Sequence, residues 1–359
     1  MKSRKNGKIE VFRLFFALVV VLHHANKSLN LSWFRFHGFT FFNRGYLGVE
    51  FFFLLTGYFM GKTIDKQLQQ NSQGDLGVET AQFAGKKFKA VWKPHMFSFI
   101  ILFIAVVIIE QYDFGQIWEL ALQSLPSFFF IQKTGFQIVN LNNVEWYISC
   151  MLLVVVILYP LCKKYYSMFV HVIGPMITLF GLGYLVRNYG TFSGVSRWNG
   201  VMYTCLIRCA AEISLGIVLY EIVRQVSNQK YSHRSRVVFT IVEWLGWILA
   251  AGIVCSNIKT KYEVYMLVFT SIALVIVLSD LSYGNELWNN KFCYECGTWS
   301  LYIYLSQQLA LEIANRYFVN KVSGMEGVIY ILLITMANAA LCRVAVYLYD
   351  RVVGREKVV

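Results

Sequence analysis

The chain has 359 residues, of which 57% are hydrophobic and 15% are charged. Soluble proteins carry about a quarter charged residues, and this much apolar surface exceeds what internal cores can bury. The composition therefore excludes an ordinary soluble protein and predicts a chain embedded in a lipid bilayer.

The formal net charge of +13 does not indicate a nucleic-acid partner. The basic residues cluster between apolar runs, as they do in the cytoplasmic loops of membrane proteins. The charge therefore predicts contact with anionic lipid head groups of the bilayer. Most of the eight cysteines lie in or beside apolar runs, so we expect buried thiols rather than a disulfide framework or a metal site.

Taken in chain order, the apolar runs predict an all-α bundle of about ten transmembrane helices, each able to cross about 30 Å of hydrocarbon. The expected ranges are 9–27, 41–61, 95–110, 146–162, 167–187, 201–223, 237–256, 261–281, 298–317 and 326–348. Ten spans put both termini on one side. The excess of Lys and Arg in the loops on that side predicts that it is the cytoplasm.

We expect residues 1–359 to form a single membrane-embedded domain with short loops and no appended soluble domain. The segment 117–131 is difficult to assign because it is short and contains Glu119 and Pro126. We expect it to lie at the membrane interface or to re-enter the bilayer rather than to cross it.

The first expected helix carries ionisable side chains, which are costly in a bilayer and therefore mark candidate functional positions. Glu10 and Arg13 are three residues apart, so they can pair on one helical face. Arg13 and His24 are eleven residues apart, close to three turns, so they share a face along the helix. For His23, the neighbour of His24, the alternative to a functional role is a structural role as a packing residue.

The second expected helix begins near Arg44 and carries Glu50. Because the first two helices are antiparallel, Glu50 is expected at the same outer depth as His24. A carboxylate beside an imidazole orients the ring and raises its basicity, so we predict that Glu50 pairs with His24. Gly45 and Gly48 leave room for the two helices to approach closely.

Two further charged groups have competing interpretations. Arg208 and Glu212 are four residues apart, which favours an intrahelical ion pair with a structural role. The basic segment 86–94, expected as an inner loop, contains Lys87, Lys89 and Lys93. It either anchors the topology and binds lipid or receives an anionic ligand.

The first two helices together resemble acyltransferase family 3, the bacterial integral-membrane O-acyltransferases. Residues 9–24 are similar to the family's opening, in which an acid precedes an Arg by three residues and a His follows that Arg by eleven. Residues 48–58 are similar to its second-helix signature, with Glu50 where Asp is usual.

Two shorter blocks extend the resemblance over the chain. Residues 145–149, which include Trp146, are similar to the Trp-containing start of a later helix of the family, and residues 300–308 are similar to its penultimate-helix signature. The chain departs from the family pattern at Gln307, where a His is common, and in the basic segment, where Lys replaces the common Arg. Lys can bind phosphate as a point charge but not in a bidentate manner.

The resemblance implies an O-acyltransferase, typically an O-acetyltransferase, in a bacterial plasma membrane. It implies cytoplasmic acetyl-CoA as the donor substrate, a hydroxyl of a cell-surface polysaccharide or lipid-linked glycan as the acceptor, and no permanently bound cofactor. The implied roles fall into three groups: catalysis by His24 and Glu50, donor binding by Arg13, Lys87, Lys89 and Lys93, and support by Glu10, His23, Arg44 and Trp146. A transporter or flippase of a lipid-linked sugar and an inactive ligand-binding homologue remain alternatives.

Overall fold

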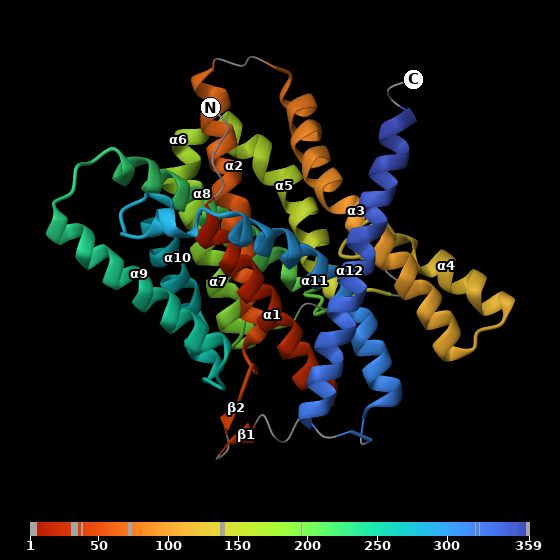
Figure 1. The fold of residues 1–359 in the computed structure, drawn as a ribbon. Helices are drawn as coiled ribbons and strands as arrows, with labels where there is room; N and C mark the ends of the chain where they lie inside the picture. Colours follow the sequence, from red (N-terminus) through yellow and green to blue (C-terminus); the bar gives the residue numbers. More distant parts are fainter. Residues whose placement is uncertain are drawn as a thin grey trace.

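The computed structural model describes residues 6–29, 35–36, 39–70, 74–136, 141–194, 196–319, 321–322 and 324–356. These residues form a bundle of long α-helices (Figure 1), and the strands found among them are the two-residue pair β1 (Arg35–Phe36) and β2 (Phe39–Thr40). The predicted all-α membrane bundle is therefore confirmed.

Each of the ten expected spans overlaps a helix of the structure. The helices are α1 (Gly7–Leu29), α2 (Gly48–Gln69), α3 (Leu76–Glu110), α4 (Phe114–Phe128), α5 (Trp146–Lys164), α6 (Tyr166–Met168), α7 (Gly174–Tyr189), α8 (Thr204–Ser227), α9 (His233–Val254), α10 (Val264–Leu278), α11 (Lys291–Tyr317) and α12 (Gly324–Glu356). Short 3-10 turns precede α2 (Gly45–Leu47) and α5 (Asn143–Glu145), and a π turn (Phe169–Ile173) joins α6 to α7.

Among the described residues, eight helical segments are long and apolar enough to cross a membrane. They comprise α1, α2, α3, α5, the α6–α7 unit, α9, α10 and α12. The other two expected spans, α8 and α11, have 24 and 27 residues but bury many polar side chains. They pack inside the bundle, α8 against α2 and α7, and α11 against α1 and α12.

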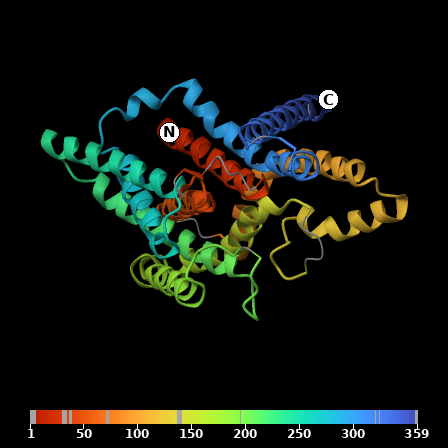
Figure 2. The ribbon, with the colours of Figure 1, turned by 90° about the horizontal axis from the view of Figure 1, so that it is seen from below.

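The ends of the bundle agree with an even number of crossings. In Figure 1, α1 runs downward and α12 runs back upward, so the start of α1 and the end of α12 face the same side. Figure 2, which views the molecule from below, shows α11 lying between α1 and α12.

Helix α3 corrects the prediction of a basic inner loop. It begins at Leu76 because the Asp75 side chain accepts a hydrogen bond from the backbone N–H of Val78 and caps the first turn. The helix then continues without a break past Pro94 to Glu110. The basic segment is therefore helical, and its lysines are distributed around the helix.

The segment at 117–131 forms most of α4, a helix of 15 residues. At 1.5 Å per residue its length is about 22 Å, less than the hydrocarbon thickness. It begins with a capping box between Asp113 and Gln116 and projects from the side of the bundle (Figure 1). One side exposes Trp118, Leu122 and Leu125. This helix is outside the set that can span a membrane, as expected for the segment.

Close helix crossings depend on glycine. A Cβ at Gly57 of α2 would collide with the Ile213 carbonyl oxygen of α8, and a Cβ at Gly216 of α8 would collide with the Leu54 carbonyl oxygen. A Cβ at Gly45 would lie 2.6 Å from the Cβ of His23, so the predicted close approach to the first helix is confirmed.

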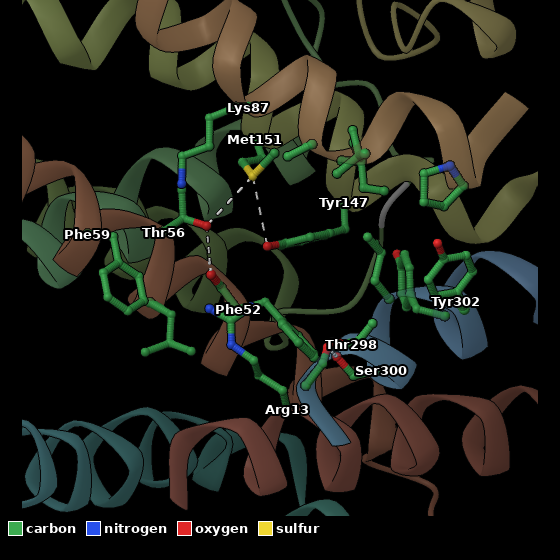
Figure 3. Close-up of a pocket in the computed structure, with 18 residues that line it drawn as sticks. Arg13, Phe52, Thr56, Phe59, Lys87, Tyr147, Met151, Thr298, Ser300 and Tyr302 are labelled. Atoms are coloured by element: carbon green, nitrogen blue, oxygen red, sulfur yellow. Dashed lines mark hydrogen bonds between the residues drawn. The ribbon is translucent and has the colours of Figure 1, made fainter. Parts of the chain in front are cut away.

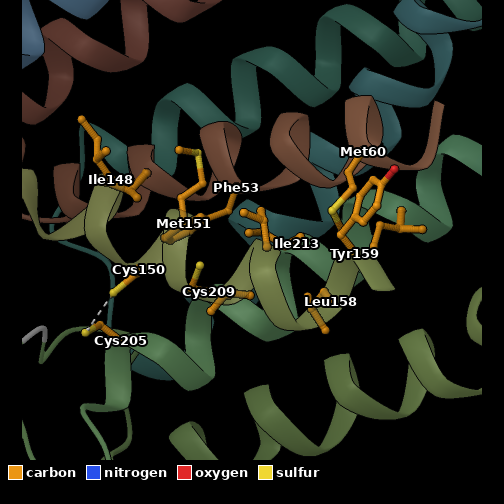
Figure 4. Packing of buried hydrophobic residues seen from close by; sticks show 14 of the residues in the cluster. Phe53, Met60, Ile148, Cys150, Met151, Leu158, Tyr159, Cys205, Cys209 and Ile213 are labelled. Carbon is orange, nitrogen blue, oxygen red and sulfur yellow. Dashed lines mark hydrogen bonds between the residues drawn. The ribbon is translucent and has the colours of Figure 1, made fainter. Parts of the chain in front are cut away.

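The core at the centre of the bundle lies where α2, α5 and α8 meet. Figure 4 shows Phe53 and Met60 from α2 packed with Met151 from α5 and Ile213 from α8. All eight cysteines are free thiols, and seven of them are buried. The expectation of small hydrophobic thiols without disulfide bonds is confirmed.

Candidate functional site

A cavity of about 420 Å³, which we call the central cavity, lies among α1, α2, α3, α5 and α11 (Figure 3). Its walls are mostly apolar and aromatic, and its charged lining residues in the described chain are both basic, Arg13 and Lys87. Figure 3 shows these two side chains extending into the cavity from opposite walls. The structure thus brings two of the predicted donor-binding residues together.

Arg13 is held on α1 beside Glu10 and α11. Its Nε lies 3.7 Å from Glu10 Oε2, so the predicted pair on one helical face is confirmed, although this distance is too long for a hydrogen bond. Glu10 lies against Gly297, where any Cβ would collide with the carboxylate. Arg13 Nε has no hydrogen-bond partner among the described residues, and Arg13 is part of the cavity lining.

The three lysines predicted to bind the donor separate on α3. Lys87 lines the central cavity, whereas Lys89 is exposed and outside the lining. Lys93 is also outside the lining and forms an ion pair with Asp350 of α12. With 3.6 residues per turn, positions two and six residues beyond Lys87 lie on other faces of the helix. The structure therefore does not bring Lys89 and Lys93 to the cavity.

Hydroxyl groups line the middle of the central cavity. The Thr56 hydroxyl donates to the Phe52 carbonyl oxygen at 2.9 Å and lies 3.6 Å from Met151 Sδ. The Tyr147 hydroxyl lies 4.0 Å from the same sulfur (Figure 3). Trp146 is 5% exposed and absent from the described lining, so it is a packing residue behind the wall.

Glu50 corrects the predicted catalytic pair. Among the described residues its carboxylate interacts with Arg208, with Oε1 3.4 Å from the guanidinium Nη2, and forms no contact with His24. Arg208 Nε also donates to Glu212 Oε1 at 2.7 Å, which confirms the intrahelical pair. A fully buried carboxylate requires a nearby cation, and Arg208 on α8 supplies it.

The two histidines of α1 lie away from the central cavity. His23 Nδ1 is 3.0 Å from the Phe42 carbonyl oxygen, which can only accept, so the Nδ1–H of His23 is the donor. In the neutral ring this leaves Nε2 as the lone-pair nitrogen. The His24 ring packs edge to face on His23, with centroids 5.3 Å apart. The pair therefore lies in the C-terminal part of α1.

A second cavity of about 640 Å³, which we call the polar cavity, opens beside this histidine pair. Its described lining is polar: His23, Asn26, Lys27, Asn43, Arg44, Tyr46, Thr191, Ser193, Asn257 and Thr260. Arg44 Nε donates to the Ile258 carbonyl oxygen at 2.7 Å, and Arg44 Nη1 lies 3.6 Å from the buried Glu263 carboxylate. His24 itself is outside the described lining.

A family model described as an acyltransferase domain, Acyl_transf_3, matches residues 6–346. This chain belongs to that acyltransferase family. The match spans nearly the whole bundle, including both cavities, so the protein is a multi-pass membrane acyltransferase. No curated protein and no solved structure matches the chain.

The acyltransferase also contains a buried pair that the sequence analysis missed. His95 Nδ1 lies 2.7 Å from Glu145 Oε1, and its Nε2–H donates to the Phe128 carbonyl oxygen at 2.9 Å. Both side chains are fully buried. His95 directly follows Pro94, which lines the central cavity. The pair therefore joins α3 to the 3-10 turn that precedes α5. Ionisable side chains within a bilayer mark candidate functional positions, and the same criterion applied to His95 would have identified it from the sequence.

A second missed pair anchors the start of α1 in the acyltransferase. Lys8 Nζ lies 2.9 Å from Glu243 Oε1 of α9, and the Trp247 indole N–H donates to the same oxygen at 3.3 Å. Lys8 is 1% exposed. This contact joins α1 to α9 through a buried ion pair.

Proposed function

We propose that this acyltransferase is an O-acetyltransferase of a bacterial plasma membrane. It takes an acyl group from cytoplasmic acetyl-CoA and transfers it to a hydroxyl of a cell-surface polysaccharide or lipid-linked glycan. The observation that carries this proposal is the pair Arg13 and Lys87 facing one cavity of a membrane bundle with no carboxylate in its described lining.

The central cavity suits an anionic donor with an apolar arm. Two cations line a cavity whose described lining holds no carboxylate, and Glu10, outside that lining, can balance one of them at most. CoA supplies phosphate groups for Arg13 and Lys87, and a guanidinium can bind phosphate in a bidentate manner. The aromatic and aliphatic wall, including Phe52, Leu55 and Tyr147, would contact the arm that carries the thioester. Lys89 and Lys93, outside the cavity, would act only by attracting the donor.

The polar cavity suits the acceptor. Its amides, hydroxyls and cations match the hydrogen-bonding groups of a saccharide. It touches α1 at His23, ten residues from Arg13, which corresponds to about 15 Å along the helix. Donor and acceptor would therefore approach the same helix at different depths.

We propose His24 as the catalytic group at the outer part of α1. In one route its ring nitrogen removes the proton from the acceptor hydroxyl while that oxygen attacks the thioester carbonyl, and CoA leaves as the thiolate. In the other route His24 attacks the thioester first, CoA leaves, and the acceptor then takes the acyl group from the imidazole. Either route requires the donor arm to extend along α1 towards His24. Glu50 would act on this region only through its buried contact with Arg208.

The test is acyl transfer by the purified protein reconstituted in liposomes. Continuous release of the CoA thiol from acetyl-CoA, beyond one equivalent per protein, should require a candidate glycan in either route, and His24→Ala should abolish it. His23→Ala is the matched control, because its ring contacts the Phe42 carbonyl and the polar cavity; it should raise the acceptor requirement and retain turnover. Wild-type turnover by His24→Ala would overturn the catalytic assignment. Uptake of glycan without thiol release would favour the transporter.

A further inference from the structure

Lys133 is a buried cation outside both cavities. It lies between α4 and α5 and is 1% exposed. Its ammonium lies 4.9 Å from the centre of the Tyr203 ring. Among the described residues it forms neither an ion pair nor a side-chain hydrogen bond. A buried ammonium is costly without a counter-charge, and a cation–π contact offsets only about 2 kcal/mol of that cost.

Lys133 is one of the residues that line an apolar groove of about 530 Å³ between α5, α7 and α8. The groove wall includes Leu153 and Ile157 from α5, Ile177 from α7 and Leu206 from α8. Of the described residues that line it, Lys133 alone is charged. None of these lining residues lines the central or the polar cavity.

The groove opens towards the lipid-facing side of the bundle. Ile157 is 67% exposed, and its neighbours on α5 and α7 include the exposed Val156 and Leu179. In a membrane these surfaces contact acyl chains. The groove thus combines an apolar trough that reaches the bilayer with a single cation in its described lining.

We propose that this groove binds one acyl chain of an anionic bilayer phospholipid, with the lipid phosphate at Lys133. The hydrocarbon chain would cover the apolar wall, and the phosphate would supply the counter-charge that the described protein residues do not. A zwitterionic lipid supplies a phosphate too, but its own cationic group competes with Lys133. The site is therefore selective for net negative charge and is independent of the donor and acceptor proposed above.

Occupancy would also stabilise the first turns of α8. Tyr203, which faces the Lys133 ammonium, immediately precedes α8. Arg208, the partner of Glu50, lies about one turn further along the same helix. A bound phospholipid would therefore fix the start of the helix that supports the buried charge cluster.

Native mass spectrometry of the detergent-purified protein tests this site without an activity assay. The protein is titrated with phosphatidylglycerol or phosphatidylcholine of identical acyl chains. We expect the wild type to retain phosphatidylglycerol at least tenfold more tightly, Lys133→Arg to keep this preference, and Lys133→Met to lose it. Lys164→Met is the matched control, because Lys164 is exposed, lies outside the groove and also faces a tyrosine ring, with its ammonium 5.3 Å from the centre of Tyr165.

A second variant keeps the lysine and fills the groove. Ala210 lines the groove on α8, and Ala210→Phe should reduce phosphatidylglycerol binding while Lys133 is retained. Equal retention of the two lipids by the wild type would overturn the proposal, as would an unchanged preference in both Lys133→Met and Ala210→Phe. Displacement of phosphatidylglycerol by a low concentration of a polyprenyl phosphate would overturn the assignment to a bilayer phospholipid.

Discussion

At the scale of single residues, the central cavity is characterised by the contacts of its two cations, Arg13 and Lys87. Arg13 has Glu10 at 3.7 Å on its own helix, and Lys87 has the Phe83 ring 5.6 Å away. The described lining of the cavity contains no carboxylate, so an anion in the cavity would face both cations. This feature distinguishes them from Lys8 and Arg208, which are tied to buried carboxylates.

Replacing either cavity cation should weaken donor binding. A hydrogen bond to a charged group contributes about 1.5–3 kcal/mol, so Arg13→Gln or Lys87→Gln should raise the KM for acetyl-CoA roughly tenfold to a hundredfold. The measurement is initial rate against donor concentration at saturating acceptor. Lys89→Gln, on another face of α3, is the control and should leave this KM within about twofold. An unchanged donor KM in both cavity variants would remove the central cavity from donor binding.

The His95–Glu145 pair should be a stability determinant. Removal of one partner of a buried pair leaves an uncompensated polar or charged group, at a cost of about 3–5 kcal/mol. Glu145→Ala should therefore lower the thermal unfolding temperature of the detergent-purified protein markedly. Glu119→Ala is the control, since Glu119 is exposed on α4 and accepts only from Gln123 one turn away. Equal melting of the two variants would show that the buried pair is dispensable.

At the scale of helices, the crossing of α2 and α8 is one of the tightest approaches of two helix backbones in the described bundle. Here the backbones approach so closely at Gly57 and Gly216 that a methyl group has no space. The same two helices carry Glu50 and Arg208, so the crossing sets how these side chains meet. Close approach through small residues is a common way for membrane helices to pack without a hydrophobic driving force.

Gly57→Ala should separate the two helices. Overpacking typically costs 1–3 kcal/mol, so we expect a lower unfolding temperature and weaker packing around Glu50. Gly252→Ala is the matched control, because Gly252 also lies within a helix, α9, and a Cβ there meets nothing within 4 Å. The control should be neutral or slightly stabilising, since alanine favours helix over glycine. A Gly57→Ala protein as stable as the control would contradict the close crossing.

The helices themselves could be predicted from the sequence, but their rotations could not. Apolar runs predict where a helix lies, and contacts within one helix follow from spacing, as Glu10–Arg13 and Arg208–Glu212 show. Contacts between helices depend on which face each one presents. The sequence predicted Glu50 at the depth of His24, but Gly45 is the residue that lies beside His23, and Phe51 stacks on Phe16. Glu50 therefore lies deeper along α1 than His24, and α2 turns its carboxylate towards Arg208 of α8.

The same limit explains the basic segment of α3. Its lysines were grouped because they are close in sequence, which is the correct criterion for a loop. In a helix of 3.6 residues per turn they diverge, and only Lys87 of the predicted three reaches the cavity. The polar cavity was also beyond sequence reasoning, since Asn26, Thr191 and Asn257 come from segments far apart along the chain.

At the scale of the whole molecule, the part of α3 that borders the central cavity and the rim of the polar cavity should lie on opposite sides of the membrane. We expect a membrane-impermeant maleimide to label Lys89→Cys from the cytoplasmic side and Asn26→Cys from the other side, in a background with Cys255→Ser. Cys255 is the native cysteine that is not buried, so this background should react weakly. Sealed vesicles of known orientation provide the measurement, and labelling of both positions from one side would contradict the proposed arrangement.

Helix α1 runs unbroken from Gly7 to Leu29, with Arg13 at the central cavity and His23 at the polar cavity. A continuous helix keeps its two ends at a constant separation. Under the proposed function, neither the nucleotide nor the sugar would have to cross the bilayer, because the arm of CoA that carries the acyl group would extend along that distance. Acyl transfer would then take place along a helix of fixed length. It would not require the large rocking motions by which transporters carry a whole substrate from one side to the other.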